Sequence, residues 1–182
     1  LLIQPLNVFT KQLSVLALLV AFIYPFTKRF FAIPQAVLGI AFGFGIPMAY
    51  AAVLDFIPLE AWFLFIGNIF WAIAYDTAYA MVDREDDLRL GLRTSAITFG
   101  QYDVIAIAIS YGMLFLSQLW VAQLAGLSNY FLVGWFAAFA CAIYHLKLVS
   151  TRNRENCFKA FRHNNWLGGF LFLGIVLGLA VH

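Results

Sequence analysis

The sequence predicts an all-α integral membrane protein, a helical bundle with about six transmembrane helices. Its composition is the first reason: 64% of the 182 residues are hydrophobic and only 11% are charged, whereas about 25% are charged in a typical soluble domain. The second reason is the arrangement of this apolar material in six stretches, each near the ~20 residues that a helix needs to cross a bilayer. Such stretches are too long and too uniformly apolar for the strands of a membrane barrel.

We expect the transmembrane helices at residues 8–27, 34–54, 61–82, 102–124, 130–149 and 166–181. Proline suits the starts and ends of helices, so Pro25 and Pro34 are expected to bracket the first loop, and Pro58 lies in the second. The polar stretch 150–165 is expected to form the fifth loop and to contain Cys157. The chain shows no soluble domain and no internal repeat, so we treat it as a single transmembrane domain.

The basic residues predict how the bundle is oriented. Nine of the 11 lysines and arginines fall in the first, third and fifth predicted loops, namely Lys28, Arg29, Arg84, Arg89, Arg93, Arg152, Arg154, Lys159 and Arg162. Because cytoplasmic loops carry the excess of positive charge, these three loops are expected to face the cytoplasm. The first residue is then outside, and it is a leucine rather than a methionine. The leucine start indicates a fragment or a processed product, and an odd number of missing helices would account for the orientation.

An acidic cluster at the end of the third predicted helix is the main candidate for a functional site. Five of the nine acidic residues lie between Asp76 and Asp87, although a charged side chain costs about 2.5–3.5 kcal/mol at the centre of a membrane helix. Asp76, Tyr79, Asp83 and Asp87 are spaced three, four and four residues apart, which places them along one helix face. Asp83 and Asp87 are therefore expected to reach the same ion.

Magnesium is the ion that this arrangement favours. Mg²⁺ is usually held by one or two carboxylates together with waters and phosphate oxygens of a substrate. Arg84, Arg89 and Arg93 follow the acidic residues and supply guanidinium groups that match phosphate geometry. The sequence thus predicts a site for a divalent metal ion and a diphosphate. A solvated helix end with mixed charges is the alternative for residues 84–93, but it leaves the intramembrane Asp76 unexplained.

The first loop offers a second part of this site. Tyr24, Lys28 and Arg29 leave the first helix on the same side of the membrane as the acidic cluster, and together they would complete a diphosphate pocket. The alternative is an ordinary basic anchor with an interfacial tyrosine. Asn68, two turns before Asp76, either lines the pocket or hydrogen-bonds a neighbouring helix.

Several other features have simpler interpretations. Three glycines and a proline in the second span, Gly39, Gly43, Gly45 and Pro47, predict close helix packing and a kink. The histidines at positions 145, 163 and 182 have no metal-ligand spacing, and two cysteines are too few for a disulfide framework or a zinc site.

Four segments of the sequence resemble the UbiA superfamily of intramembrane prenyltransferases. YDTAYAMVDREDDLRLGLRTSA (75–96) is similar to the second aspartate-rich motif of this family, and YPFTKR (24–29) is similar to its YxxxK element. VLGIAFGFGIPMAYAA (37–52) and CFKAFRHNNWLGG (157–169) also resemble the branch that prenylates 4-hydroxybenzoate. The resemblance covers essentially the whole chain.

The resemblance implies a fold of nine transmembrane helices around a central cavity, of which this chain would supply the last six. It implies that Asp83 and Asp87 bind Mg²⁺ and that Tyr24, Lys28 and Arg29 act with them in catalysis. Asp76, Tyr79, Arg89 and Arg93 would bind the substrate, with Asn68 beside them, although the family often has lysine where this chain has Arg93. The first aspartate-rich motif, NDxxDxxxD, does not occur in this sequence.

The implied reaction is transfer of a polyprenyl group from polyprenyl diphosphate to the ring of 4-hydroxybenzoate, in the bacterial inner membrane and on its cytoplasmic side. Membrane lipid is then a partner and nucleic acid is not. Without the first motif, we expect this chain alone to be inactive. The alternatives are another branch of the superfamily (a menaquinone, haem O or chlorophyll-type prenyltransferase), a cation-coupled transporter or a purely structural membrane subunit. A transporter site usually lies near the bilayer midplane between repeats, whereas these charges gather at one face.

Overall fold

The computed structural model describes residues 3–181, and every regular element in that range is a helix. In chain order the helices are α1 (Val8–Thr27), α2 (Pro34–Gly43), α3 (Gly45–Leu54), α4 (Leu59–Val82), α5 (Arg84–Arg89), α6 (Ser95–Phe99), the 3₁₀ helix η1 (Gly100–Tyr102), α7 (Asp103–Leu124), α8 (Phe131–Val149) and α9 (Arg154–Ala180). Six helical units are long and apolar enough to cross a membrane, with α2 and α3 forming one and α6 to α7 another. All six predicted spans are therefore present.

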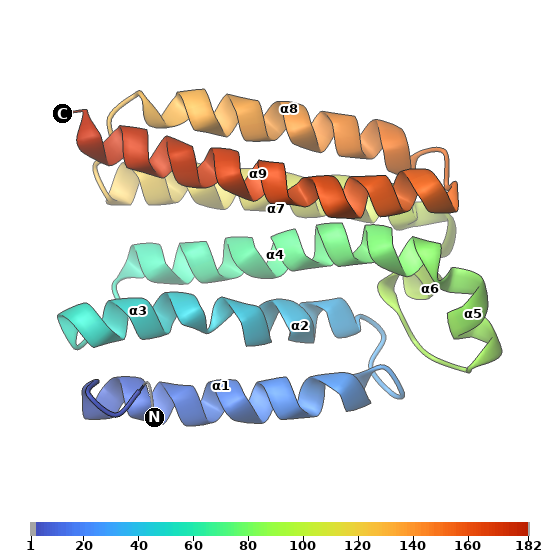
Figure 1. Cartoon of the computed structure of the whole chain (residues 1–182), viewed down its shortest axis with the longest axis horizontal. Helices are drawn as coiled ribbons and strands as arrows, with labels where there is room; N and C mark the ends of the chain where they lie inside the picture. The colour runs from blue at the N-terminus through green and yellow to red at the C-terminus, as the bar shows by residue number, and fades with distance from the viewer. Residues whose placement is uncertain (1–2, 182) are drawn as a thin grey trace.

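The connections alternate between the two ends of the bundle. The α1–α2 loop, the segment with α5 and α6, and the α8–α9 loop lie at one end, whereas the α3–α4 and α7–α8 loops lie at the other (Figure 1). We call the first of these the charged end, defined by residues 28–33, 83–94 and 150–153. The predicted gathering of the basic loops on one side is confirmed.

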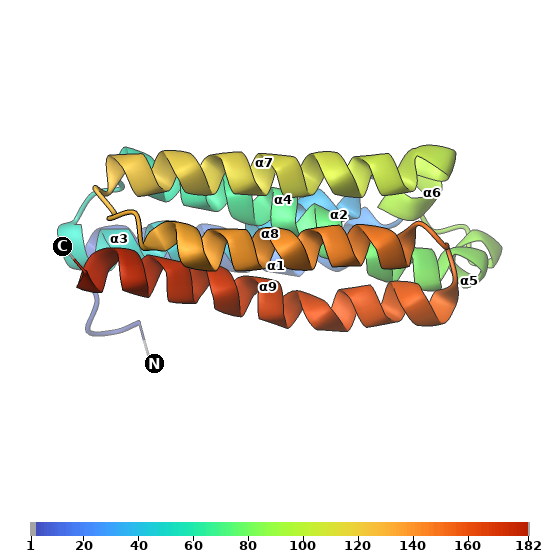
Figure 2. The ribbon, with the colours of Figure 1, turned by 90° about the horizontal axis from the view of Figure 1, so that it is seen from above.

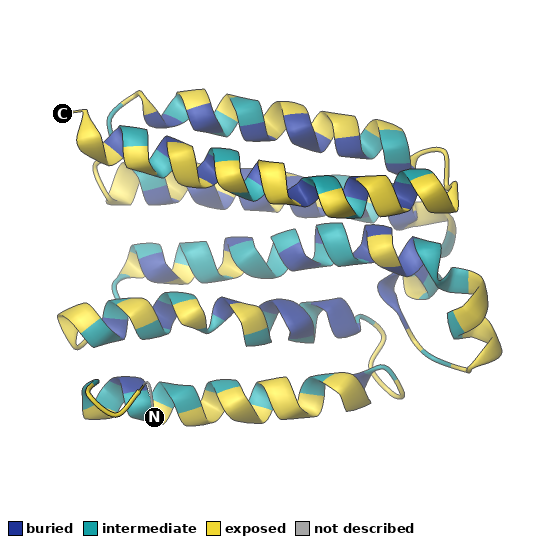
Figure 3. Cartoon of the chain, in the orientation of Figure 1, coloured by how far each residue is buried: buried dark blue, intermediate teal, exposed yellow. Residues whose placement is uncertain are grey.

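Helix α4 occupies the centre of the molecule. It packs against α7, α2 and α9, and α8 and α9 pack closely on each other (Figures 1 and 2). Small residues make this possible, because Ala74, Ala78 and Ala80 of α4 are buried in the core. Helix α1 lies at the edge and packs on α2 and α3, and most of its surface is exposed (Figure 3). The core that supports the charged end therefore belongs mainly to α4, α7, α8 and α9.

The predicted fifth loop is wrong. Only residues 150–153 connect α8 to α9, because α9 begins at Arg154, where the Asn153 side chain accepts a hydrogen bond from the Glu155 amide at 2.9 Å. Cys157 lies in this helix and is fully buried, rather than in a loop. The polar composition of residues 154–166 conceals a helical stripe of buried positions, Cys157, Ala160, Asn164, Leu167 and Leu171, which faces the bundle.

The predicted kink in the second span is present. Helices α2 and α3 meet at Phe44, and Pro47 cannot donate to the carbonyl of Gly43, so the hydrogen-bond ladder is interrupted there. Gly39 allows a close approach to α4, since a Cβ at this position would lie 2.8 Å from the Ile69 Cα atom. Gly39 and Gly43 thus serve packing, as predicted, whereas a Cβ at Gly45 would meet no atom within 4 Å.

Glycine also sets the contact between α8 and α9. A methyl group at Gly134 would lie 2.3 Å from the Phe170 carbonyl oxygen and 2.5 Å from the Gly174 Cα atom. We expect Gly134→Ala to destabilise the bundle by about 3 kcal/mol. The added methyl group would overlap main-chain atoms of α9, and these can move only if α8 and α9 separate. Gly112→Ala in α7 is the matched control, since a Cβ there meets no atom within 4 Å. Unfolding of both variants in detergent, followed by circular dichroism, measures the difference, and equal stabilities would contradict the close packing.

Candidate functional site

The acidic cluster lies where α4 ends and α5 begins. Asp83 is the single residue between the two helices, with φ −94° and ψ 4°, and its carbonyl accepts a hydrogen bond from the Asp87 amide at 2.8 Å. Both side chains are half-buried, whereas those of Glu85 and Asp86 are exposed. Asp83 and Asp87 are thus more buried than the other two carboxylates.

Backbone contacts fix the first loop against the segment that follows α5. The Arg93 amide donates to the Lys28 carbonyl at 2.7 Å, and the Arg93 guanidinium donates to the Phe30 carbonyl at 3.1 Å. The Thr98 hydroxyl donates to the Ala32 carbonyl. The basic loop and the acidic helix end are therefore neighbours in the folded chain, as predicted.

Lys28 is the basic residue that influences the carboxylates of this site. Its ammonium is close enough to Asp76 and to Asp87 to interact electrostatically with both. Partial burial raises the pKa of Asp87 above its usual value, and the nearby Asp83 and Asp86 charges raise this pKa further, while Lys28 opposes the shift. A cation placed between Asp83 and Asp87 would relieve this repulsion.

The deeper part of the site is formed around Asp76. The Tyr24 ring at the end of α1 lies near this carboxylate, and the Gln35 side chain lies within hydrogen-bonding reach of it. Gln35 is itself fixed, because its Oε1 accepts a hydrogen bond from the buried Ser95 amide at 3.0 Å. Tyr79 is partly exposed and lies beside Asp83. The structure thus brings Tyr24, Lys28, Asp76, Tyr79, Asp83 and Asp87 together.

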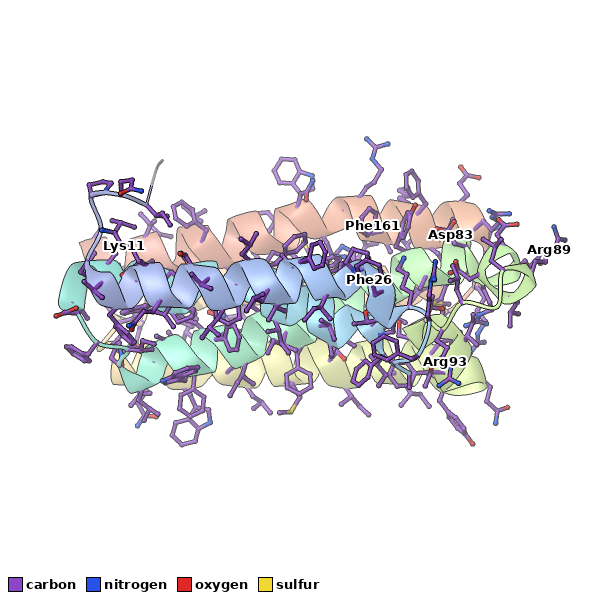
Figure 4. All side chains as sticks on the ribbon, turned by 90° about the horizontal axis from the view of Figure 1, so that it is seen from below. Lys11, Phe26, Asp83, Arg89, Arg93 and Phe161 are labelled. Carbon is purple, nitrogen blue, oxygen red and sulfur yellow. The ribbon has the colours of Figure 1, made fainter. Side chains whose placement is uncertain are left out.

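Among the described residues, none of the other predicted arginines forms an ion pair with Asp76, Asp83 or Asp87. Arg89 projects beyond the charged end, away from Asp83, and its nearest charged partner is Asp86 at 3.9 Å (Figure 4). Arg29 is exposed on the α1–α2 loop. Arg93 lies at the same end as Asp83, but on the other side of the first loop (Figure 4). Arg84, expected to serve phosphate oxygens, is instead held by the buried Asp103.

A cavity of about 480 Å³ is lined by residues of α2, α4 and α9. Four aromatic side chains line it, Phe42, Trp71, Tyr75 and Phe161, together with Arg162 and asparagine amides. Asn68 donates to the Gly39 carbonyl at 3.0 Å, which is the predicted hydrogen bond to a neighbouring helix, and it also lines this cavity.

Aromatic rings connect this cavity to the acidic cluster. The Trp71 and Tyr75 rings are 5.8 Å apart, Tyr75 and Phe161 are 6.1 Å apart, and Phe161 and Tyr79 are 4.9 Å apart. Phe161 of α9 and Phe26 of α1 both lie further from the charged end than Asp83 (Figure 4). An apolar molecule with a phosphate head would thus place its head at Asp83 and its tail among these rings.

A chain of buried hydrogen bonds holds one wall of the cavity. The Asn164 Oδ1 atom accepts from the Trp71 indole at 3.1 Å and from the Tyr111 hydroxyl at 2.9 Å. The Tyr111 oxygen lies 3.0 Å from His145 Nδ1, and His145 Nε2 lies 2.9 Å from His163 Nδ1. Two of the predicted histidines are therefore satisfied by neighbours within the bundle, whereas His182 lies outside the described residues.

We expect Asn164→Leu to destabilise the bundle by about 1–2 kcal/mol, because the Trp71 and Tyr111 donors would lose their acceptor in an apolar surrounding. Asn165→Leu, at an exposed neighbouring position, should change stability by less than about 0.5 kcal/mol. Unfolding in detergent compares the two. A stability loss no larger for Asn164→Leu than for Asn165→Leu would show that the network contributes little.

Within residues 3–181, no three side chains of His, Cys, Asp or Glu gather closely enough to enclose a metal ion. The acidic cluster instead offers an open pair of carboxylates, which matches how Mg²⁺ is held when a phosphate supplies further oxygens.

Sequence reasoning missed several residues around the site. Gln35 was not singled out, although it directly follows the proline that starts α2. Trp71, Tyr75 and Phe161 are aromatic residues in a chain that is 18% aromatic, so nothing in the sequence marks them. The sequence could have identified Asp103, because a lone carboxylate at the start of an apolar span indicates a structural or functional role.

Comparison with known proteins gives a consistent result. Residues 1–178 match the UbiA prenyltransferase family. Over all 182 residues the chain is 93% identical to a 4-hydroxybenzoate octaprenyltransferase of Polynucleobacter necessarius subsp. necessarius (strain STIR1), and it spans 63% of the length of that relative. It is 60% identical over 175 residues to a 4-hydroxybenzoate octaprenyltransferase of Burkholderia ambifaria (strain MC40-6), covering 60% of that protein.

One solved structure is also similar. The apo structure of a UbiA homolog from Aeropyrum pernix K1 superposes with a TM-score of 0.75 and 22% sequence identity, over 92% of this chain and 65% of that one. This likeness concerns the fold, and it confirms the all-helical membrane architecture predicted from the sequence.

Proposed function

Because the chain belongs to the UbiA prenyltransferase family, and is therefore an integral membrane protein, we propose that it contributes to transfer of a polyprenyl group from polyprenyl diphosphate to the ring of 4-hydroxybenzoate in ubiquinone biosynthesis. The observation that carries the proposal is the gathering of Lys28 with the Asp76 and Asp87 carboxylates at the charged end, next to aromatic rings that lead to a cavity. The relatives of 93% and 60% identity, both named 4-hydroxybenzoate octaprenyltransferase, support the choice of acceptor.

The donors at the acidic cluster fit magnesium. Asp83 and Asp87 are half-buried, and neither forms an ion pair among the described residues, whereas Asp86 pairs with Arg154 at 3.2 Å. Two open carboxylates at a helix end suit an ion that keeps waters and takes phosphate oxygens. When bound, Mg²⁺ would neutralise charge that develops on the diphosphate as it leaves.

Side chains of this protein would bind the diphosphate and stabilise the allylic cation. Lys28 stands where a diphosphate held at Asp83 and Asp87 needs a further cation, and Arg29 lies next to it. The rings of Tyr75, Tyr79 and Phe161 would face the allylic carbon as it becomes positively charged, since aromatic faces attract cations. The same rings would exclude water from this carbon. The ring of 4-hydroxybenzoate would then attack the allylic carbon through its own carbon ortho to the hydroxyl group, and that ring carbon would afterwards lose its proton.

The distribution of basic residues indicates which side of the membrane the site faces. The charged end carries most of the basic residues, and cytoplasmic faces of bacterial membrane proteins are enriched in these. We therefore propose that the site opens towards the cytoplasm from the bacterial inner membrane. The prenyl tail would run along α4 and α9, where a second pocket of about 180 Å³ lined mainly by apolar side chains continues from Asn68 and Trp71.

The test is an assay of a chimaera, in which the part of the Polynucleobacter relative that this chain does not cover is joined to residues 1–182. In proteoliposomes with Mg²⁺, octaprenyl diphosphate and 4-hydroxybenzoate, we expect prenylated 4-hydroxybenzoate and released diphosphate. Parallel reactions with the aromatic acceptor of menaquinone synthesis, haem or a chlorophyll precursor test the other branches of the superfamily. Product from one of these acceptors alone would overturn the proposed substrate.

A further inference from the structure

Asp103 is a fully buried carboxylate held between two arginines. Its oxygens accept from the Arg84 guanidinium, from Arg152 Nη2 at 2.9 Å and from the Val104 amide at 2.7 Å. Arg152 also donates to the Gln101 carbonyl at 2.8 Å. The three charged residues come from the α4–α5 junction, the start of α7 and the α8–α9 loop. A buried acid with this many donors is fixed in position.

This arrangement decides where the Arg84 side chain lies. Arg84 directly follows Asp83 and stands three residues before Asp87 in the same short helix. Residues at that spacing are neighbours on a helix surface and form ion pairs readily. Arg84 nevertheless contacts Asp103 and the Ala96 carbonyl at 2.9 Å, on the α7 side of the junction.

A second ion pair acts on the same side. Arg154 at the start of α9 binds Asp86 at 3.2 Å, so Asp86 is engaged by α9. The charges of α5 are thus sorted. Arg84 and Asp86 are engaged by α7 and α9, while Asp83 and Asp87 remain open towards the first loop.

We propose that Asp103 is a positioning residue that withdraws Arg84 from Asp83 and Asp87, so that these two carboxylates stay available to a divalent cation. This inference rests on the proposed function, because it concerns the metal pair of that site. Without the Asp103 charge, Arg84 pairs with Asp87 and competes with the cation for it. Arg152 has a different role, since its loss leaves Arg84 bound to Asp103.

The experiment measures Mn²⁺ binding to the 182-residue chain in lipid nanodiscs by electron paramagnetic resonance, which reports free Mn²⁺. Four variants are compared with the unchanged chain, namely Asp103→Asn, Arg84→Gln, the double variant and Arg152→Gln. Helix content and a single symmetric gel-filtration peak establish that each is folded. We expect Asp103→Asn to weaken Mn²⁺ binding roughly tenfold, and the double variant to restore it to within about twofold of the unchanged chain.

Arg152→Gln is the matched control, because it removes several hydrogen bonds to Asp103 but does not free Arg84. It should bind Mn²⁺ as the unchanged chain does. If Asp103 were only a structural anchor, the double variant would bind as weakly as Asp103→Asn, and that result would overturn the inference. Arg84→Gln keeps the Asp103–Arg152 pair, so it tests the inference even if Asp103→Asn does not fold. Weaker Mn²⁺ binding by Arg84→Gln than by the unchanged chain would also overturn the inference.

Failure of the proposed function looks different. The variant Asp83→Asn/Asp87→Asn should lose the Mn²⁺ binding of the unchanged chain. If it binds Mn²⁺ equally well, the metal pair itself is wrong. If it loses binding while Asp103→Asn keeps it, the metal pair stands and only the role of Asp103 is rejected.

Discussion

Replacing Asp83 or Asp87 by alanine in the chimaera lowers prenyl transfer about 10²–10³-fold, the size of loss seen when one group that stabilises transition-state charge is removed. The carboxylates are half-buried, adjacent along one helix face and without an ion-pair partner among the described residues. If the proposed function is right, each substitution removes a ligand from an ion that has few protein ligands. Release of diphosphate, measured under saturating 4-hydroxybenzoate, gives the rate.

Glu85→Gln is the matched control for these variants. Glu85 lies in the same short helix and carries the same charge, but it is exposed and borders a pocket lined by Arg84, Arg152 and Arg154. It should retain near-normal activity. Near-normal prenyl transfer by both Asp83→Ala and Asp87→Ala would end the assignment of the metal pair.

The 182-residue chain by itself should form no detectable prenylated product. The family resemblance implies two facing aspartate-rich motifs, and this sequence contains one of them. Within residues 3–181 no cluster of three metal-ligating side chains exists, so a divalent ion at Asp83 and Asp87 would take its other ligands from water. A diphosphate would therefore lack half of its counter-charge, and the leaving group would not be stabilised.

The comparison uses the purified chain and the chimaera in the same nanodiscs, with equal amounts of protein and the same substrates. Mixing the chain with the missing part of the relative as a separate polypeptide is a useful third sample, because recovery of activity there would exclude misfolding of the chain. Turnover by the chain alone would refute the expectation and would mean that the charged end is a complete site.

Most of the fold could be predicted because lipid imposes strong constraints. Each span must be long, apolar and helical, so the spans up to residue 149 are predicted within about two residues of the observed ends of α1, α2–α3, α4, α7 and α8, although the fourth apolar unit already begins at Ser95. The start of α9 was missed because polarity indicated a loop, while the buried stripe through Cys157 and Ala160 carried the helix signal. Outside the bilayer, composition is a weaker guide than periodicity.

The candidate site could be predicted only in part. Clustering of charge in a chain that otherwise avoids it identified Asp83, Asp87 and Lys28, and the folded chain brings these residues together. The partner of each arginine could not be derived, because Arg84 lies 19 residues from Asp103 and 49 residues separate Asp103 from Arg152. Pairings across such distances depend on the tertiary packing of α4, α7 and α9.

The hydrogen bond from the Arg93 amide to the Lys28 carbonyl has a consequence for how this site can vary. Both atoms belong to the main chain, so the spacing of the two segments does not depend on which side chains stand at these positions. Residues 28 and 93 can exchange lysine for arginine, changing donor geometry while the separation of the loops is preserved. A main-chain tether of this kind lets substrate preference drift through single substitutions without first loosening the scaffold that holds the reacting groups.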